Sequence, residues 1–174
     1  FVGIDMALRH DSVAIVYGQK DDNEVVNMKA KIWKPEDQVY MDYQEIEAFV
    51  IELMKLYKVT EVAYDPAFFE RSAQVLLDRG VPMVNFPQTH SRMIPACGNA
   101  YDMIVNNKVR HDGDPTFTDQ VMSAAQKTTD MGWRLSKGRS KRKIDACIAM
   151  VLMLDRITAP TPEDNDPEVS IINL

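Results

Sequence analysis

The sequence predicts a single α/β domain in which one mixed sheet carries helices on both faces. Two apolar runs, residues 1–5 and 11–17, are separated by a short connection, which indicates an antiparallel hairpin. Segments with helical spacing then alternate with short apolar runs, and this alternation is typical of parallel strands joined by right-handed crossovers. A length of 174 residues, 45% of them hydrophobic, suits one domain with one core.

The expected strands share short apolar or alternating patterns bounded by turn residues. They are residues 1–5, 11–17, 24–33, 58–64, 81–86, 109–111 and 128–135. The first three form an antiparallel meander, and the later ones are expected to run parallel to the first strand. Pro66 ends the fourth strand because proline cannot donate to a ladder, and Pro82 near the start of the fifth favours a sheet edge.

The expected helices show apolar residues three and four positions apart. They are residues 42–57, 68–79, 91–107, 114–127 and 144–157. Gly80 is a favourable stop for the second helix, and Asp114 followed by Pro115 supplies a cap and a first residue for the fourth. In the third helix the candidate core residues are Ile94, Tyr101, Ile104 and Val105.

The charge of the chain is unevenly distributed. A net charge of −6 argues against a protein that coats nucleic acid through its overall charge, but six basic residues lie within ten positions. They are Arg134, Lys137, Arg139, Lys141, Arg142 and Lys143. Residues 161–174 include an acidic, proline-containing stretch and are expected to form a tail with little fixed structure, which leaves residues 1–160 as the folded domain.

The bulk sequence also limits where the protein acts. No apolar run approaches the roughly 18 residues of a membrane span, and no secretion signal is visible, so no membrane partner is expected. Cys97 and Cys147 lack the spacing of a zinc site, and a reducing compartment is expected. The chain starts at Phe1, without Met and already inside a strand, so we expect a fragment of a longer protein.

Three aspartates each interrupt an apolar stretch near the end of an expected element. Asp5 ends the first strand, Asp65 ends the fourth, and Asp145 begins the last helix. If the two strands are neighbours, Asp5 and Asp65 lie side by side, and the helix crossing that end of the sheet brings Asp145 opposite. Each also has an ordinary alternative: a solvated strand end for Asp5, a turn for Asp65 and a helix cap for Asp145.

Three carboxylates at one place would repel one another and raise their own pKa values. Hard divalent cations reverse this penalty, since Mg²⁺ prefers oxygen ligands. Two such ions roughly 4 Å apart can activate a water and stabilise the leaving oxygen of a phosphodiester. The six basic residues before Asp145 are then expected to hold a phosphate backbone, with a solvated loop as the alternative.

Four short stretches occur in an informative order. They are Gly3-Ile4-Asp5, Val62 to Pro66 with the helix that follows, His111 to Pro115, and Lys137 to Ala146. In this order they resemble the nuclease domain of phage large terminase subunits. The resemblance implies a ribonuclease H-like fold and two-metal cleavage of double-stranded DNA, with Mg²⁺ or Mn²⁺ and little sequence preference.

The resemblance also implies which residues carry the reaction. Asp5, Asp65 and Asp145 would be the catalytic metal ligands, and Asp11 would be a further ligand, with capping of the first turn as its alternative. The ATPase motor of these proteins precedes the nuclease, and this sequence has no phosphate-binding loop, so we expect an isolated C-terminal domain. The implied partners are double-stranded DNA, that ATPase domain, the portal protein and the small terminase subunit, in the cytoplasm of an infected bacterial host.

Other readings of the same residues remain open. A Holliday-junction resolvase of related fold also opens with a Gly-Ile-Asp strand, and a docking module of a packaging motor would need no catalysis. A sugar-kinase or actin-like half-domain needs glycine-rich turns, which a chain with seven glycines does not provide. His90 and His111 are expected to be polar loop residues rather than ligands.

Overall fold

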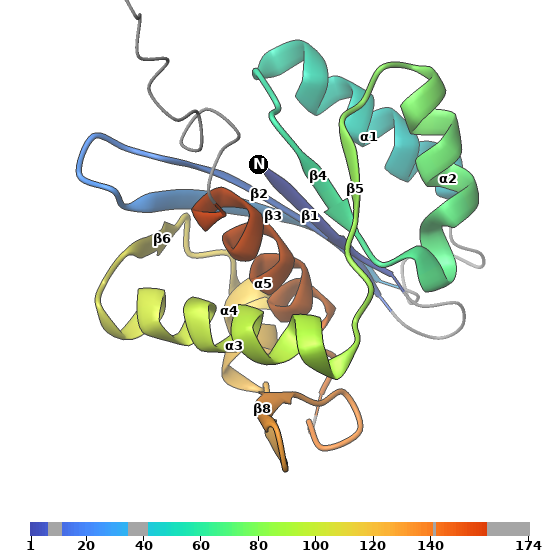
Figure 1. The fold of residues 1–174 in the computed structure, drawn as a ribbon. Helices are drawn as coiled ribbons and strands as arrows, with labels where there is room; N and C mark the ends of the chain where they lie inside the picture. The colour runs from blue at the N-terminus through green and yellow to red at the C-terminus, as the bar shows by residue number, and fades with distance from the viewer. Residues whose placement is uncertain (7–11, 35–41, 141, 160–174) are drawn as a thin grey trace, which may run out of the picture.

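The computed structural model describes residues 1–6, 12–34, 42–140 and 142–159. In this part of the chain a six-stranded sheet lies between two layers of helices, with a small hairpin at one end (Figure 1). The sheet strands are β1 (Val2–Asp5), β2 (Val13–Lys20), β3 (Val26–Trp33), β4 (Val62–Tyr64), β5 (Met83–Asn85) and β6 (Val109–His111). The hairpin strands are β7 (Gln126–Thr129) and β8 (Gly132–Leu135).

The helices form the two outer layers. They are α1 (Tyr43–Leu56), α2 (Pro66–Asp78), α3 (His90–Val105), α4 (Pro115–Met122) and α5 (Asp145–Thr158). One buried cluster joins the sheet to α1 and α2, and a second joins its other face to α3, α4 and α5. No helix of the described segments is long and apolar enough to cross a bilayer. The expected tail beyond residue 160 lies outside the described residues.

The sheet has the expected mixed topology. Its strand order is β5-β4-β1-β2-β3-β6, in which β1, β2 and β3 pair antiparallel and β4, β5 and β6 pair parallel to their neighbours. The register pairs Gly3 with Ala63 and Ile4 with Tyr64, so the ends of β1 and β4 lie next to each other. The two short strands β5 and β6 form the edges, and the edge position expected from Pro82 is confirmed for β5.

Local capping decides where two helices begin. The α2 helix starts at Pro66, two residues earlier than expected, because the Asp65 side chain accepts the amide of Ala67 at 3.1 Å and Pro66 fits the first helical position. The α4 helix starts at Pro115 behind Asp114, as expected, but it ends at Met122 rather than near residue 127. The residues beyond it form β7, which pairs with β8, so the single strand expected at residues 128–135 is a hairpin.

The buried side of α3 differs from the expected one. Tyr101 and Val105 are 56% and 52% exposed, and the expected core positions Ile94 and Ile104 are not buried either. The buried residues are Met93, Ala96, Cys97 and Ala100. Small side chains on this face let α3 lie close to α5 and β8, while the larger Tyr101 packs edge-on against the Trp133 ring at 6.0 Å.

The α5 helix occupies the centre of its layer, as the view in Figure 1 shows. It contacts β1, β2 and β4 on one side and α3 and α4 on the other, so it is buried on nearly every side. A helix covered in this way must be apolar all round, which explains the long hydrophobic run after Asp145. Asp145, the first residue of α5, is therefore buried above the sheet.

Candidate metal centre

Asp5 is the last residue of β1 and is completely buried. Val2 and Ile4 face the α1 and α2 layer, so the alternation of the strand turns Asp5 to the opposite face, where α5 lies. The amide of Gln88 donates a hydrogen bond of 2.7 Å to Asp5 Oδ1. The alternative of a solvated strand end is therefore wrong for Asp5.

Asp145 is the first residue of α5 and is also completely buried. The hydroxyl of Ser12 donates to Asp145 Oδ2. No side chain caps α5 from the cap residue Ile144, but Gln120 Oε1 of α4 accepts the amide of Ala146 at 2.7 Å. Gln120, and not the carboxylate of Asp145, thus satisfies that amide, while the carboxylate bonds to other side chains.

Lys137 connects the two buried aspartates. Its Nζ lies 2.7 Å from Asp5 Oδ2 and 2.5 Å from Asp145 Oδ1. Sequence reasoning assigned Lys137 to the phosphate backbone of DNA, whereas the structure places its ammonium between two carboxylates. Ser12, Gln88 and Gln120 were missed as supporting residues, because nothing in their local sequence indicates contacts with residues so distant in the chain.

The electrostatics of the cluster are unbalanced. Burial raises the pKa of Asp5 to about 7, with the nearby charge of Asp145 adding to the rise while Lys137 and Gln88 oppose it. Burial would lower the pKa of Lys137, but Asp5 and Asp145 together raise it above its ordinary value. Two carboxylates share one ammonium, so the cluster can accept more positive charge.

Asp65 lies near Asp5 and Asp145 but is not part of their cluster. It directly follows β4, next to the end of β1, and is half-buried. Its Oδ1 caps α2, so Asp65 has a local structural role, as a helix cap and not as the turn residue given as its alternative. Within residues 1–6, 12–34, 42–140 and 142–159, no three His, Cys, Asp or Glu side chains come close enough to hold a metal ion. The structure thus brings Asp5 and Asp145 together and leaves Asp65 at the neighbouring strand end.

The donor set nevertheless fits a hard cation. Asp5 Oδ2 is buried, and among the described residues its partner is the Lys137 ammonium, 2.7 Å away. Carboxylate oxygens are the ligands that Mg²⁺ and Mn²⁺ favour. Asp5 and Asp145 are the residues that would hold such an ion, with Asp65 at the neighbouring strand end. Asp11, the further ligand implied by the resemblance, lies outside the described residues.

The other basic residues lie in different surroundings. Arg142 forms an ion pair with Asp119, Arg134 lies in β8 with its Nε buried, and Arg139 is exposed. Lys143 is half-buried, and Lys141 lies outside the described residues. A hollow of about 470 Å³ is lined in part by Ser12, whose hydroxyl donates to Asp145. Its lining includes Lys34, Gln120, Arg142 and Lys143.

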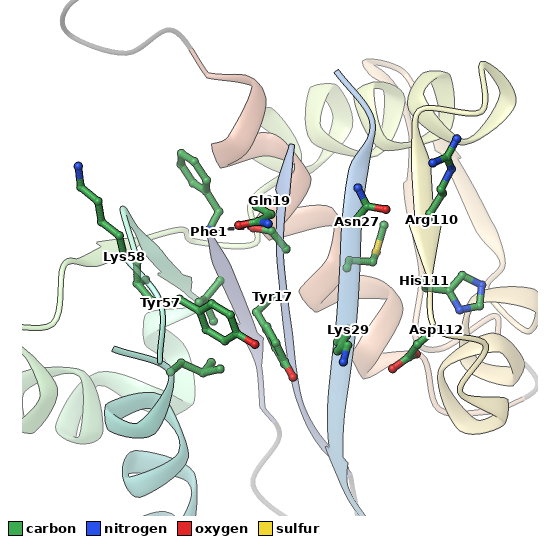
Figure 2. Close-up of a pocket in the computed structure, with 15 residues that line it drawn as sticks. Phe1, Tyr17, Gln19, Asn27, Lys29, Tyr57, Lys58, Arg110, His111 and Asp112 are labelled. Carbon is green, nitrogen blue, oxygen red and sulfur yellow. Dashed lines mark hydrogen bonds between the residues drawn. The ribbon is translucent and has the colours of Figure 1, made fainter. Parts of the chain in front are cut away.

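A second hollow, of about 480 Å³, lies at the opposite end of β1 (Figure 2). Tyr17, Tyr57 and Arg110 line it together with Phe1 and His111. None of the three aspartates contributes to it, so it is separate from the metal centre. His111 is the last residue of β6 and His90 the first of α3, so neither is the loop residue that was expected.

Most of this chain matches the model of a known protein family. Residues 19–160 match the model described as "Terminase large subunit, endonuclease domain". The terminase large subunit of Enterobacteria phage HK97 is 22% identical over 182 aligned residues, which cover 87% of this chain and 36% of the relative. The chain therefore spans little more than a third of the length of that relative.

Solved structures share the fold. The crystal structure of the HK97 bacteriophage large terminase superposes with a TM-score of 0.79 at 20% identity, covering 90% of this chain and 39% of the other. The large terminase nuclease from thermophilic phage G20c gives 0.69 at 16% identity, covering 89% and 80% of the two chains. The same nuclease with bound magnesium gives 0.68 at 15% identity, covering 89% and 79%. The ribonuclease H-like fold expected from the sequence is confirmed.

Proposed function

This chain belongs to the family of terminase large-subunit endonuclease domains, and from that premise we propose that it is a metal-dependent endonuclease acting in viral genome packaging. Its substrate is double-stranded DNA, which it cleaves by phosphodiester hydrolysis with two divalent ions, Mg²⁺ or Mn²⁺. The observation that carries the proposal is the pair of fully buried aspartates, Asp5 and Asp145, which face a single shared ammonium.

The three aspartates have distinct parts in this proposal. Asp5 and Asp145 hold one cation between the end of β1 and the start of α5, where their oxygens already converge on Lys137. Asp65 uses Oδ1 as a helix cap and offers its second oxygen to the other ion. Ser12 and Gln88 each fix one oxygen of Asp145 and Asp5, respectively, and so set the directions of the remaining oxygens.

The bound ions would supply an activated water and neutralise charge on the leaving oxygen. The chain's own residues place the DNA beside them. Lys34, Arg142 and Lys143 line a hollow together with Ser12 and Asp119, and because Ser12 donates to Asp145, a phosphate backbone lying there would pass near Asp145. Arg139 and Lys141 lie just before Arg142 in the sequence and add two positive charges to this segment.

Packaging requires more than this chain. The chain covers 36% of its HK97 relative, and a large terminase of similar fold, from another thermophilic bacteriophage, was solved in complex with ATP-gamma-S. We therefore assign the translocating ATPase to another part of the full-length protein. The portal protein and the small terminase subunit are further partners in the host cytoplasm, and docking to them is compatible with nuclease activity.

A plasmid-nicking assay tests the proposal. Supercoiled DNA is incubated with the protein and Mn²⁺, Mg²⁺, Ca²⁺ or chelator, and nicked and linear forms are measured. Cleavage is expected with Mn²⁺ or Mg²⁺ and none with chelator. Asp5→Asn and Asp145→Asn should each lose cleavage while remaining folded, whereas Asp102→Asn, an exposed carboxylate on α3, should cleave at the wild-type rate.

Two results would change the assignment. Cleavage that persists in chelator, or in both site variants, would remove the metal centre from the reaction. A strong preference for four-way junctions over linear duplex would favour a resolvase instead.

A further inference from the structure

The ammonium of Lys137 occupies the place of a cation in the metal centre. It contacts Asp5 Oδ2 at 2.7 Å and Asp145 Oδ1 at 2.5 Å, and these are the oxygens of two completely buried carboxylates. A Mg²⁺ ion bound by the same two oxygens would stand at about 2.0–2.1 Å from each. One gap between two carboxylates cannot hold both an ammonium and a divalent ion, because the two cations would overlap and repel each other.

The turn that carries Lys137 is held at its ends, while the Lys137 side chain reaches solvent. Ser136 donates its amide to the carbonyl of Ala125 at 2.9 Å, and the hydroxyl of Ser140 accepts the amide of Ala125 at 3.0 Å. The Lys137 side chain is 37% exposed, although its ammonium meets two buried oxygens. The side chain can therefore swing outward by rotation about its own bonds, without movement of the anchored turn.

We infer that Lys137 is a displaceable substitute for the catalytic metal ion: it bridges Asp5 and Asp145 in the metal-free protein and is expelled when a divalent ion binds. The inference rests on the proposed function, since it assigns these aspartates to a metal. It gives Lys137 two effects. The ammonium keeps the two carboxylates together in the absence of metal, and it weakens metal binding because the ion must first displace it.

The expelled ammonium stays on the turn beside the site. Ser12, which donates to Asp145, lines a hollow with Lys34, Arg142 and Lys143, so a DNA phosphate in that hollow would lie near the expelled ammonium. Metal binding and DNA binding would thus support each other, because the ion releases a cation that the phosphate can use. Lys137 acts here as a positioning residue, through the carboxylates and not on the scissile bond.

Mn²⁺ titration of Lys137→Met tests this inference, with free Mn²⁺ followed by electron paramagnetic resonance. The variant is expected to bind Mn²⁺ on the order of tenfold more tightly than wild type, because no ammonium has to leave. Its melting temperature should fall in chelator, where two buried carboxylates face each other, and recover with Mn²⁺. The matched control is Arg139→Met, which removes one charge from the same turn and should change neither quantity.

A second measurement separates displacement from a permanent contact. Lys137 is labelled with an amine-reactive reagent and quantified by mass spectrometry, with the exposed Lys55 of α1 as the internal reference. Mn²⁺ should increase labelling of Lys137 severalfold and leave Lys55 unchanged. If Lys137→Met does not fold in chelator, Lys137→Gln replaces it, since its amide can still donate to one carboxylate.

Different results would overturn the displacement of Lys137 and the nuclease proposal. Equal or weaker Mn²⁺ binding by Lys137→Met and Lys137→Gln, or unchanged labelling of Lys137, would overturn the displacement while the nuclease proposal stands. A wild-type protein that binds no Mn²⁺ and nicks no plasmid would overturn both.

Discussion

Gly3 of β1 lies directly against the backbone of Ala149 in α5. A Cβ added to Gly3 would stand 2.1 Å from the carbonyl oxygen of Ala149 and 2.8 Å from the amide nitrogen of Met153. Only glycine permits this approach, because both neighbours are backbone atoms that cannot turn aside. The contact fixes the height of α5 above the sheet.

This contact also explains how Asp5 and Asp145 meet. From Gly3 to Asp5 the strand advances two residues, about 6.6 Å, and from Ala149 back to Asp145 the helix advances four residues, about 6 Å. The two advances match, so the last residue of β1 and the first residue of α5 arrive at the same level. Lys137 then reaches both from the turn after β8.

Gly3→Ala should destabilise the protein by about 3 kcal/mol, the upper part of the range for overpacking a core, because only backbone movement can make room. The free energy of unfolding in urea measures the effect. Gly98→Ala is the matched control: no atom lies within 4 Å of its added Cβ, and alanine in the interior of α3 should stabilise by up to about 1 kcal/mol. Equal stability of the two variants would contradict the close approach.

Asp65→Asn should separate the capping role of this residue from its proposed metal role. Asparagine caps a helix about as well as aspartate, so the free energy of unfolding should change by less than about 0.5 kcal/mol. Plasmid nicking with Mn²⁺ should be lost, because the amide carries no charge. Asp114→Asn changes the same kind of cap, also followed by proline, in α4 and should retain both stability and nicking. Full nicking by Asp65→Asn would leave this residue as a cap alone.

Gln120→Met should destabilise the start of α5. The variant leaves the buried amide of Ala146 without the acceptor that Gln120 supplies at 2.7 Å, at a cost of about 1–2 kcal/mol. Asp145 should also lose its fixed position, so binding of Mn²⁺ should weaken. Gln74→Met on the exposed face of α2 is the control, and its unfolding free energy should change little. An unchanged free energy of unfolding for Gln120→Met would show that another group satisfies the amide of Ala146.

Neutralising Arg139, Lys141 and Arg142 together should weaken binding to duplex DNA and make it less dependent on salt. The slope of log affinity against log salt should fall by about 0.9 for each phosphate contact removed. The comparison variant neutralises Lys29, Lys31 and Arg110, which gives the same charge change on strands β3 and β6. Fluorescence anisotropy at several salt concentrations measures both slopes. Identical slopes in the two variants would make residues 139–142 a plain solvated loop.

Local sequence was sufficient for most elements of the fold. Alternation indicated the meander, Asp114 and Pro115 marked the start of α4, and periodicity indicated the five helices, although α2 begins two residues before the expected start. It did not show which face of α3 is buried, because Tyr101 and Val105 have the same spacing as core residues. That choice depends on the small residues Ala96 and Ala100, which let a neighbouring helix come close.

The candidate site also has some features that the sequence indicates and others that depend on the packing of its elements. Asp5 and Asp145 could be found from the sequence because each is a charged residue in an apolar stretch at the end of an element, where burial requires a partner. Arg139 and its basic neighbours could be found by their density. Their separate environments could not, since the pairing of Arg142 with Asp119 depends on how α4 packs.

The sequence by itself determined the order of strands and helices and the positions of Asp5, Asp65 and Asp145 at their ends, because these follow from patterns a few residues long. Only the tertiary structure decided that Lys137 bridges Asp5 and Asp145 and that Ser12, Gln88 and Gln120 support them. Those contacts join residues far apart in the chain, and they form only when α5 settles on Gly3 and brings separate elements to one point.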